Sequence, residues 1–122
     1  MMSLSGAGEI RLTRGDTFSM PIVINQGTNM VPIRYVLNEK DEVYFGVMEP
    51  NQPFEVALIR KKYTKEHLNE DGDVQLRLRH EDTMCLLPGK YYYQVKVRLY
   101  NDSIQDYEVS TIIGKTPFYI EE

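Results

Sequence analysis

The sequence has 122 residues and a formal net charge of −4, and 42% of its residues are hydrophobic. This length suits one domain with its own hydrophobic core, because domains most often contain about 100 to 150 residues. One cysteine and two histidines exclude an internal disulfide framework and leave little material for a metal centre. The net charge is mildly acidic and the two signs are interspersed, so the sequence shows no basic patch of the kind that binds nucleic acid.

The N-terminal segment 1–8 is rich in Ser and Gly, which predicts a flexible arm ahead of a single domain over 9–122. The arm has neither the basic region nor the apolar stretch of a signal peptide. No apolar run reaches the roughly 20 residues that a bilayer span needs. We therefore expect a protein that is made inside a cell and has no membrane partner.

Apolar residues alternate with a period of two from Ile10 onward, which indicates strands rather than helices. The first stretch, 17–25, contains Pro21 and is expected to be an edge strand or to carry a bulge, because proline cannot donate to a ladder. A turn is expected at 27–29. Two short strands follow, over 33–37 and 43–48.

The second half of the sequence continues the same pattern. A strand is expected over 56–63, with its inner face ambiguous, and a polar loop over 61–73 in which one helical turn at 64–68 is the alternative. Further strands are expected over 74–78, 91–100 and 107–113, and a last one with Phe118 and Ile120 after breaks at Gly114 and Pro117.

About seven to nine short strands with turn signals every 8 to 12 residues or so predict an all-β sandwich or barrel. Pro88 and Gly89 form a corner ahead of the longest strand, and a tyrosine enters that strand. This arrangement is typical of the tyrosine corner, with Tyr91 or Tyr93 as the tyrosine. Because this corner occurs in immunoglobulin-like sandwiches, it favours an antiparallel β-sandwich over a closed barrel.

Several short motifs have a functional and a structural interpretation. Arg14-Gly15-Asp16 matches an integrin tripeptide, although Gly and Asp also make a tight turn into a strand. His80-Glu81-Asp82 fits a polar loop better than a metal or acid–base site, and Asp71-Gly72-Asp73 fits a hairpin turn better than a calcium loop. Cys85 lies among apolar residues and is expected to be a buried, unreactive thiol. We therefore predict no catalytic, cofactor-binding or metal-binding residues and no enzyme activity.

Tyrosine is the more informative residue type. By alternation, Tyr44, Tyr92 and Tyr100 face away from the core, which suits a protein–protein interface because tyrosine is enriched there. The alternative is that a partly wet sheet face simply tolerates tyrosine. Basic residues also lie at outward strand positions, namely Arg77, Arg79, Lys96 and Arg98. Their acidic neighbours favour a solvated sheet face over a basic stripe.

Five motifs follow one another in a recognisable order: Arg14-Gly15-Asp16-Thr17-Phe18, Val43-Tyr44-Phe45-Gly46-Val47, Asp71-Gly72-Asp73-Val74, Leu87-Pro88-Gly89-Lys90-Tyr91 and Gly114-Lys115-Thr116-Pro117-Phe118. Their order resembles the N-terminal domain of phage baseplate upper proteins and related small phage virion proteins. The resemblance covers roughly residues 9–120 and implies an immunoglobulin-like attachment module of a tail or baseplate.

The resemblance also implies partners and a location. The partners would be other virion proteins, in a symmetric ring or homo-oligomer. The protein would be made in the host cytoplasm and reside in the virion. In that family, linker and receptor-binding regions commonly follow this domain, and here the sequence stops, so we expect an assembly or attachment subunit. The alternatives are a carbohydrate- or ligand-binding β-sandwich and a capsid or neck decoration protein.

Overall fold

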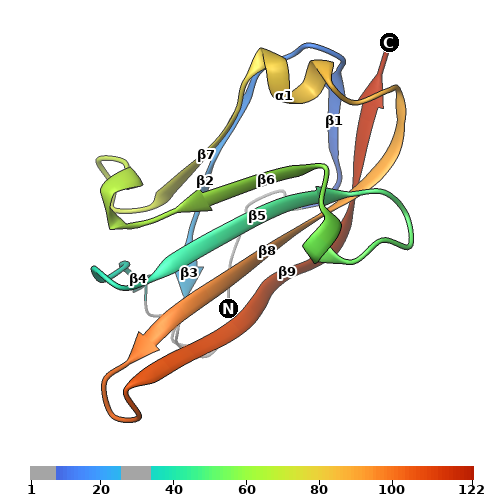
Figure 1. Cartoon of the computed structure of the whole chain (residues 1–122). Helices are drawn as coiled ribbons and strands as arrows, with labels where there is room; N and C mark the ends of the chain where they lie inside the picture. Colours follow the sequence, from blue (N-terminus) through green and yellow to red (C-terminus); the bar gives the residue numbers. More distant parts are fainter. Residues whose placement is uncertain (1–7, 26–33) are drawn as a thin grey trace.

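A computed structural model of the chain describes residues 8–25 and 34–122 (Figure 1). The main sheet has five strands in the order β1 (Ile10–Thr13), β9 (Asp106–Glu121), β8 (Gly89–Asn101), β5 (Glu42–Met48) and β6 (Ile59–Tyr63). Two smaller sheets pair β2 (Phe18–Ile22) with β7 (Val74–Leu78), and β3 (Ile24–Asn25) with β4 (Arg34–Tyr35). The helical segments are short: η1 (Phe54–Val56), η2 (Lys65–His67) and α1 (His80–Met84).

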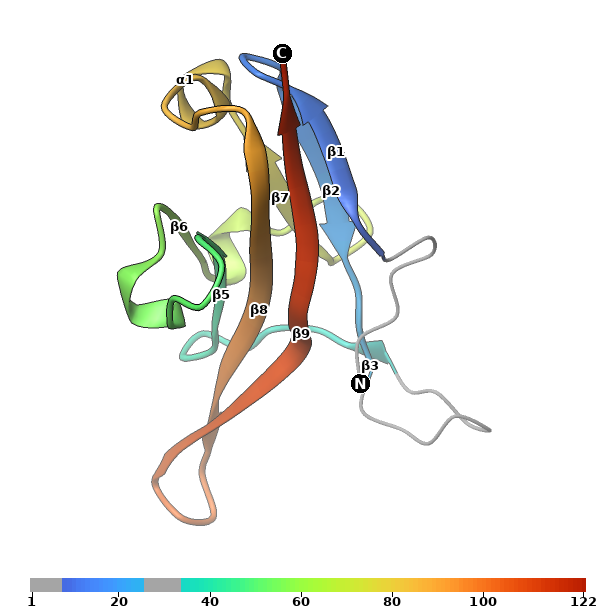
Figure 2. The same cartoon turned by 90° about the vertical axis from the view of Figure 1, so that its right-hand side faces the viewer.

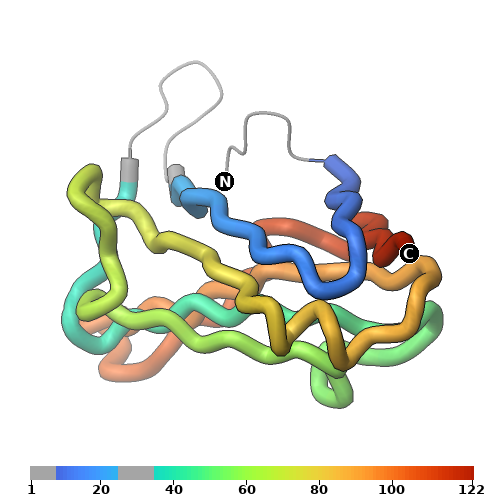
Figure 3. Tube along the Cα trace, turned by 90° about the horizontal axis from the view of Figure 1, so that it is seen from above, coloured from blue at the N-terminus to red at the C-terminus, as the bar shows by residue number. Residues whose placement is uncertain are grey.

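The main sheet is curled, and the β2–β7 pair lies over its concave side as a second layer (Figures 2 and 3). One apolar core fills the space between the two layers. Phe45, Tyr93 and Phe118 enter it from the main sheet, with ring centroids 5.8 Å apart for Phe45–Tyr93 and 6.4 Å for Tyr93–Phe118. Ile22 and Leu76 enter it from the second layer. The predicted all-β class is confirmed at this level.

The expectation that all strands run antiparallel is wrong for β1. This strand pairs in parallel with the end of β9, from Ile10 opposite Phe118 to Thr13 opposite Glu121. The turn at 14–17 leads the chain from β1 into β2, which belongs to the other layer. Because β1 and β2 do not form a hairpin, β1 is free to lie beside a strand that is remote in sequence, and the main sheet is mixed.

The expected break at Gly114 and Pro117 is also absent, since β9 runs without interruption from Asp106 to Glu121. Pro117 lies opposite Tyr92 of β8, and β1 begins to pair with β9 only at Phe118. A proline is tolerated in a strand whose second edge has no strand partner. Two shifts of register, between Tyr93 and Val95 and between Val95 and Lys96, mark an irregular stretch in which β9 has two more residues than β8.

Two polar segments contain short helices where loops were favoured. At η2, the backbone amide of Thr64 donates to Nδ1 of His67, 3.0 Å away. At α1, the backbone amide of Arg79 donates to the carboxylate of Asp82 over 2.8 Å, which satisfies a donor that the helix itself leaves unpaired. In addition, the strand expected from 56 begins only at Ile59, because η1 precedes it. The predicted turn at 27–29, the position of Ile33 and all but the last residue of the arm 1–8 lie outside the described residues.

Candidate protein–protein interface

The convex side of the main sheet, which faces away from β2 and β7, is called the outer face below. Strand register assigns residues to it, because side chains alternate between the two sides of a sheet. The three tyrosines predicted to face outward, Tyr44, Tyr92 and Tyr100, all occupy outer-face positions and are partly buried. Two further tyrosines, Tyr107 and Tyr119, share this face through their pairing with Tyr100 and Lys90.

Tyr100 and Tyr107 form the first aromatic cluster of the outer face, near the far end of the β8–β9 hairpin. Their rings meet edge to face with centroids 5.2 Å apart. The guanidinium of Arg98 lies 3.7 Å from the centroid of Tyr107, and the ammonium of Lys40 lies 4.1 Å from that of Tyr100. Cations over ring faces attract the ring quadrupole and restrain both side chains.

Glu42 links this cluster to Tyr44. Its carboxylate accepts from Lys62 over 2.6 Å and from Arg98 over 2.9 Å, and the hydroxyl of Tyr44 donates to it over 3.1 Å. The Lys62 contact is the main cause that holds the pKa of Glu42 below its ordinary value, with Arg98 and Tyr44 adding to it against the effect of burial. Burial and the adjacent carboxylate raise the pKa of Tyr44. Tyr44 and Tyr100 therefore belong to one connected network.

Tyr92 lies in a second cluster, toward the other end of β8. The ammonium of Lys90 is 5.2 Å from the Tyr92 centroid and 5.9 Å from that of Tyr119. The guanidinium of Arg11 lies 4.0 Å over Tyr119 and also pairs with Glu121 at 3.2 Å. Alternation with the buried Phe118 and Ile120 was the sequence signal that could have placed Tyr119 outward.

The segment around η1 covers the middle of the outer face and separates the two clusters. Phe54 and Ala57 lie over Gly46, where an added Cβ would come within 2.7 Å of the Phe54 ring. Met48, also at an outer-face position, is fully buried. The ammonium of Lys96 lies 5.1 Å from the Phe54 centroid. Two aromatic patches therefore flank a raised centre.

The outer face is basic although the chain as a whole is acidic. Among its described strand positions, the carboxylates are Glu42 and Glu121 and the cations are Arg11, Arg60, Lys62, Lys90, Lys96 and Arg98. The whole chain has 14 basic and 18 acidic residues. This face therefore carries an excess of positive charge, which is complementary to carboxylates.

The corner residues lie at the start of β8. Pro88 and Gly89 connect α1 to this strand, and the hydroxyl of Tyr91 donates back to the carbonyl of Leu87 over 2.6 Å. The hydroxyl of Tyr93 donates instead to the carbonyl of Gly8 over 2.9 Å. Burial raises the pKa of both phenols. These two tyrosines brace the fold from the inner side of the sheet, whereas Tyr44, Tyr92 and Tyr100 lie on its outer face.

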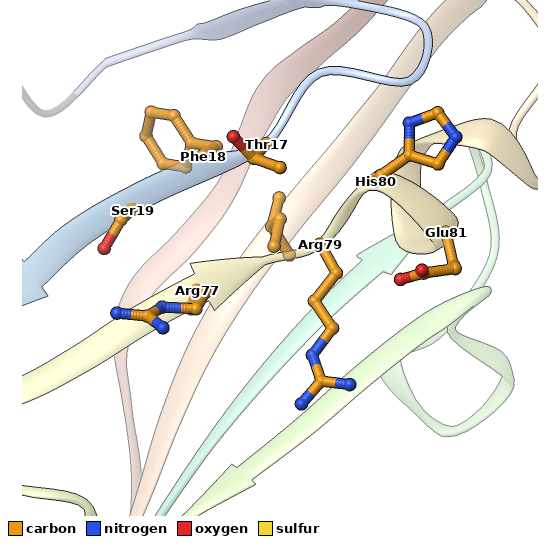
Figure 4. Close-up of a pocket in the computed structure, with 8 residues that line it drawn as sticks. Thr17, Phe18, Ser19, Arg77, Arg79, His80 and Glu81 are labelled. Atoms are coloured by element: carbon orange, nitrogen blue, oxygen red, sulfur yellow. The ribbon is translucent and has the colours of Figure 1, made fainter.

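A separate hollow of about 520 Å³ lies at the end of the molecule that carries α1 (Figure 4). Thr17, Phe18 and Ser19 line one side of it, and Arg77, Arg79 and His80 line the other. Figure 4 shows the two guanidiniums extending to different sides, with Arg77 beside Ser19. The possible basic stripe of the sequence therefore lies on two surfaces. Arg77 and Arg79 line the hollow, whereas Lys96 and Arg98 belong to the outer face.

No protein family, no curated protein and no solved structure matches this chain. The support for a function therefore comes from the geometry described above and from the order of the sequence motifs. None of the described helices is long and apolar enough to cross a membrane.

The remaining motifs have local structural roles. Arg14 donates twice to the carbonyl of Met84, at 2.9 and 3.1 Å, and the carboxylate of Asp16 accepts from the amide of Thr13 over 3.1 Å. The tripeptide thus makes the expected turn. The turn at 71–73 is held by Asn69, whose side-chain oxygen accepts from the amides of Asp71 and Asp73.

Cys85 departs from the prediction, because it is exposed rather than buried. It follows the last turn of α1, and its thiol donates to the carbonyl of Asp82 over 3.0 Å while Leu86 takes the buried position. Within the described residues, no group of three or more metal-ligating side chains comes together.

Proposed function

We propose that this chain is a non-enzymatic assembly protein that docks onto neighbouring proteins through the outer face of its main sheet. The observation that carries the proposal is the grouping of five tyrosines with the cations that lie over or between them. Tyrosine and arginine are enriched in the parts of interfaces that contribute most to binding. Here their side chains are restrained before a partner arrives, which lowers the entropy cost of docking.

The size of each patch favours repeated rather than single docking. The outer face has two aromatic clusters, separated by the segment that carries Phe54 and Ala57. Each cluster alone offers a modest contact area, so strong attachment requires several copies that bind at once. In a symmetric particle, the avidity of repeated copies supplies this without any larger interface.

We further propose a phage tail or baseplate as the particle, with an immunoglobulin-like sandwich as the finer description of the fold. The order of the sequence motifs supports the placement, as does the bond from Tyr91 to Leu87 four residues earlier. A tyrosine that bonds back to the preceding backbone braces the corner of such sandwiches. The parallel β1–β9 pair would then be an addition to that plan.

Two measurements test this proposal. Mass spectrometry and electron microscopy of purified particles, from the source that encodes the chain, are expected to find it at the copy number of a symmetry ring. Its absence from particles would overturn the placement.

A second experiment tests the docking surface. Particles assembled with the Tyr92→Ser/Tyr100→Ser variant are expected to incorporate less of this protein than particles assembled with the control variant Leu87→Ser. Leu87 is an exposed apolar residue outside the outer face. Equal incorporation of the two variants would overturn the docking surface.

A further inference from the structure

The tip of the β8–β9 hairpin carries acidic side chains around one exposed apolar side chain. Residues 101–108 contain three carboxylates, on Asp102, Asp106 and Glu108, and no basic residue. Ile104 lies between the two aspartates with 58% of its surface exposed. Figures 1 and 2 show the tip projecting beyond the rest of the molecule, at the end opposite α1.

Local hydrogen bonds give the tip a defined shape. The side-chain oxygen of Asn101 accepts from the amide of Ser103 over 2.9 Å, and its side-chain nitrogen donates to Glu108 over 2.8 Å. The amide of Ile104 bonds to the carbonyl of Asn101 at 3.3 Å. A turn that is ordered before binding presents its side chains at little further entropy cost.

The hollow beside α1 has the complementary character. Phe18 and Leu78, which pair across β2 and β7, are its apolar members. Arg77 and Arg79 extend to different sides of it (Figure 4). Among the described residues, neither is within ion-pair distance of a carboxylate, although Asp82, which pairs with Lys61, interacts with Arg79 at longer range. Glu81 is the one carboxylate in its lining, so the basic groups outnumber the acidic ones. Guanidiniums that diverge suit two separate carboxylates better than a single small anion.

We propose that the hairpin tip of one copy inserts into the hollow of a second copy. Ile104 would pack against Phe18, while Asp102 and Asp106 pair with the guanidiniums of Arg77 and Arg79. The two surfaces lie at opposite ends of one molecule, so the contact cannot form within a single copy (Figure 1). It is therefore a head-to-tail contact, which generates a ring if the rotation closes and a filament if it does not.

Charge reversal with complementation tests this contact. In sedimentation velocity over a concentration series, the wild-type chain is expected to self-associate. The tip variant Asp102→Lys/Asp106→Lys and the hollow variant Arg77→Glu/Arg79→Glu are each expected to associate about tenfold more weakly or worse, because like charges then oppose one another. An equimolar mixture of the two variants is expected to regain association, since every tip then meets a hollow of opposite charge.

Matched controls make the result unambiguous. Glu66→Lys/Glu70→Lys reverses two exposed charges away from the tip, the hollow and the outer face, and it is expected to leave self-association unchanged. The docking function above has a separate readout, incorporation into particles, so the two proposals fail separately. Circular dichroism and thermal melting of each variant exclude unfolding as the cause of a loss. A wild-type chain that stays monomeric at every concentration overturns the proposal. Association that survives both reversals, or a mixture that fails to recover it, overturns it equally.

Discussion

The buried carboxylate of Asp41 accepts a hydrogen bond of 2.9 Å from the backbone amide of Tyr100. Its other oxygen accepts from the amide of Asn38 over 2.8 Å and from the hydroxyl of Tyr35. One side chain thus joins the turn before β5 to the part of β8 that carries an outer-face tyrosine. The position of Tyr100 on the outer face therefore depends on Asp41, which is buried and out of reach of a partner protein.

Replacing Asp41 by Ala is expected to lower the free energy of unfolding by about 3 kcal/mol, because three donors lose their acceptor in a poorly solvated place. Urea denaturation measures the change. The matched control is Asp102→Ala at the exposed hairpin tip, where a change within about 0.5 kcal/mol is expected. A loss at Asp41 no larger than that of the control would show that its hydrogen bonds do not stabilise the fold.

Removing the Tyr91 hydroxyl tests the corner that precedes β8. Tyr91→Phe keeps the ring but breaks the 2.6 Å bond to the Leu87 carbonyl, and we expect a loss of about 1 kcal/mol in the free energy of unfolding. Tyr107→Phe is the control, because the contacts of Tyr107 with Tyr100 and Arg98 are made by its ring. Equal stability of the two variants would argue against a bracing role for the corner.

The Glu42 network predicts a loss of stability in acid. The folded-state pKa of Glu42 lies below its value in the unfolded chain, so the carboxylate stabilises the fold fully above that unfolded value, about 4.3. As the pH falls through the folded pKa, this contribution disappears, because the unfolded state binds the proton first. Urea unfolding at a series of pH values measures how the free energy of unfolding falls in acid. We expect this fall to be less steep for Glu42→Gln than for the wild-type chain. An unchanged slope would contradict the ion-pair assignment.

Gly46 is predicted to tolerate no side chain. In Gly46→Ala the new Cβ would meet the Phe54 ring at 2.7 Å and Ala57 at 3.1 Å, which is expected to displace η1 and to cost about 1 to 3 kcal/mol. Gly114→Ala is the control, since no atom lies within 4 Å of the equivalent position in β9. Thermal melting compares the two, and a partial recovery in Gly46→Ala/Phe54→Leu would locate the clash.

The period-two pattern predicted the inner and outer sides of β8 correctly, because both are set by backbone geometry alone. Tyr91, Tyr93, Val95 and Val97 are buried, as the alternation required. The parallel pairing of β1 was not predictable from the sequence, since the direction of a partner strand leaves no trace in a single stretch of residues. Cys85 was misplaced because its apolar neighbours say nothing about which side of a helix end faces solvent.

For the outer face, alternation located Tyr44, Tyr92 and Tyr100 but not what surrounds them. Alternation from Phe118 also gives Tyr107 its outward side, because the two register shifts in β9 cancel in parity, but it could not pair Tyr107 with Tyr100. Arg11 meets Tyr119 only because β1 lies beside β9. Contacts of this kind come from tertiary pairing, which a pattern within one strand cannot report.

The long β8–β9 hairpin also has a consequence for the order in which the chain folds. Its two strands are joined by a tight turn, from Asn101 to Asp106, so their ladder closes with little loss of chain entropy. The β1–β9 pair instead brings together Arg11 and Glu121, which are 110 positions apart. Because non-local pairs form slowly, we expect the hairpin to be structured in the folding transition state and the β1 strand to dock last. Substitutions at Ile10 are then expected to speed unfolding and to leave the folding rate nearly unchanged.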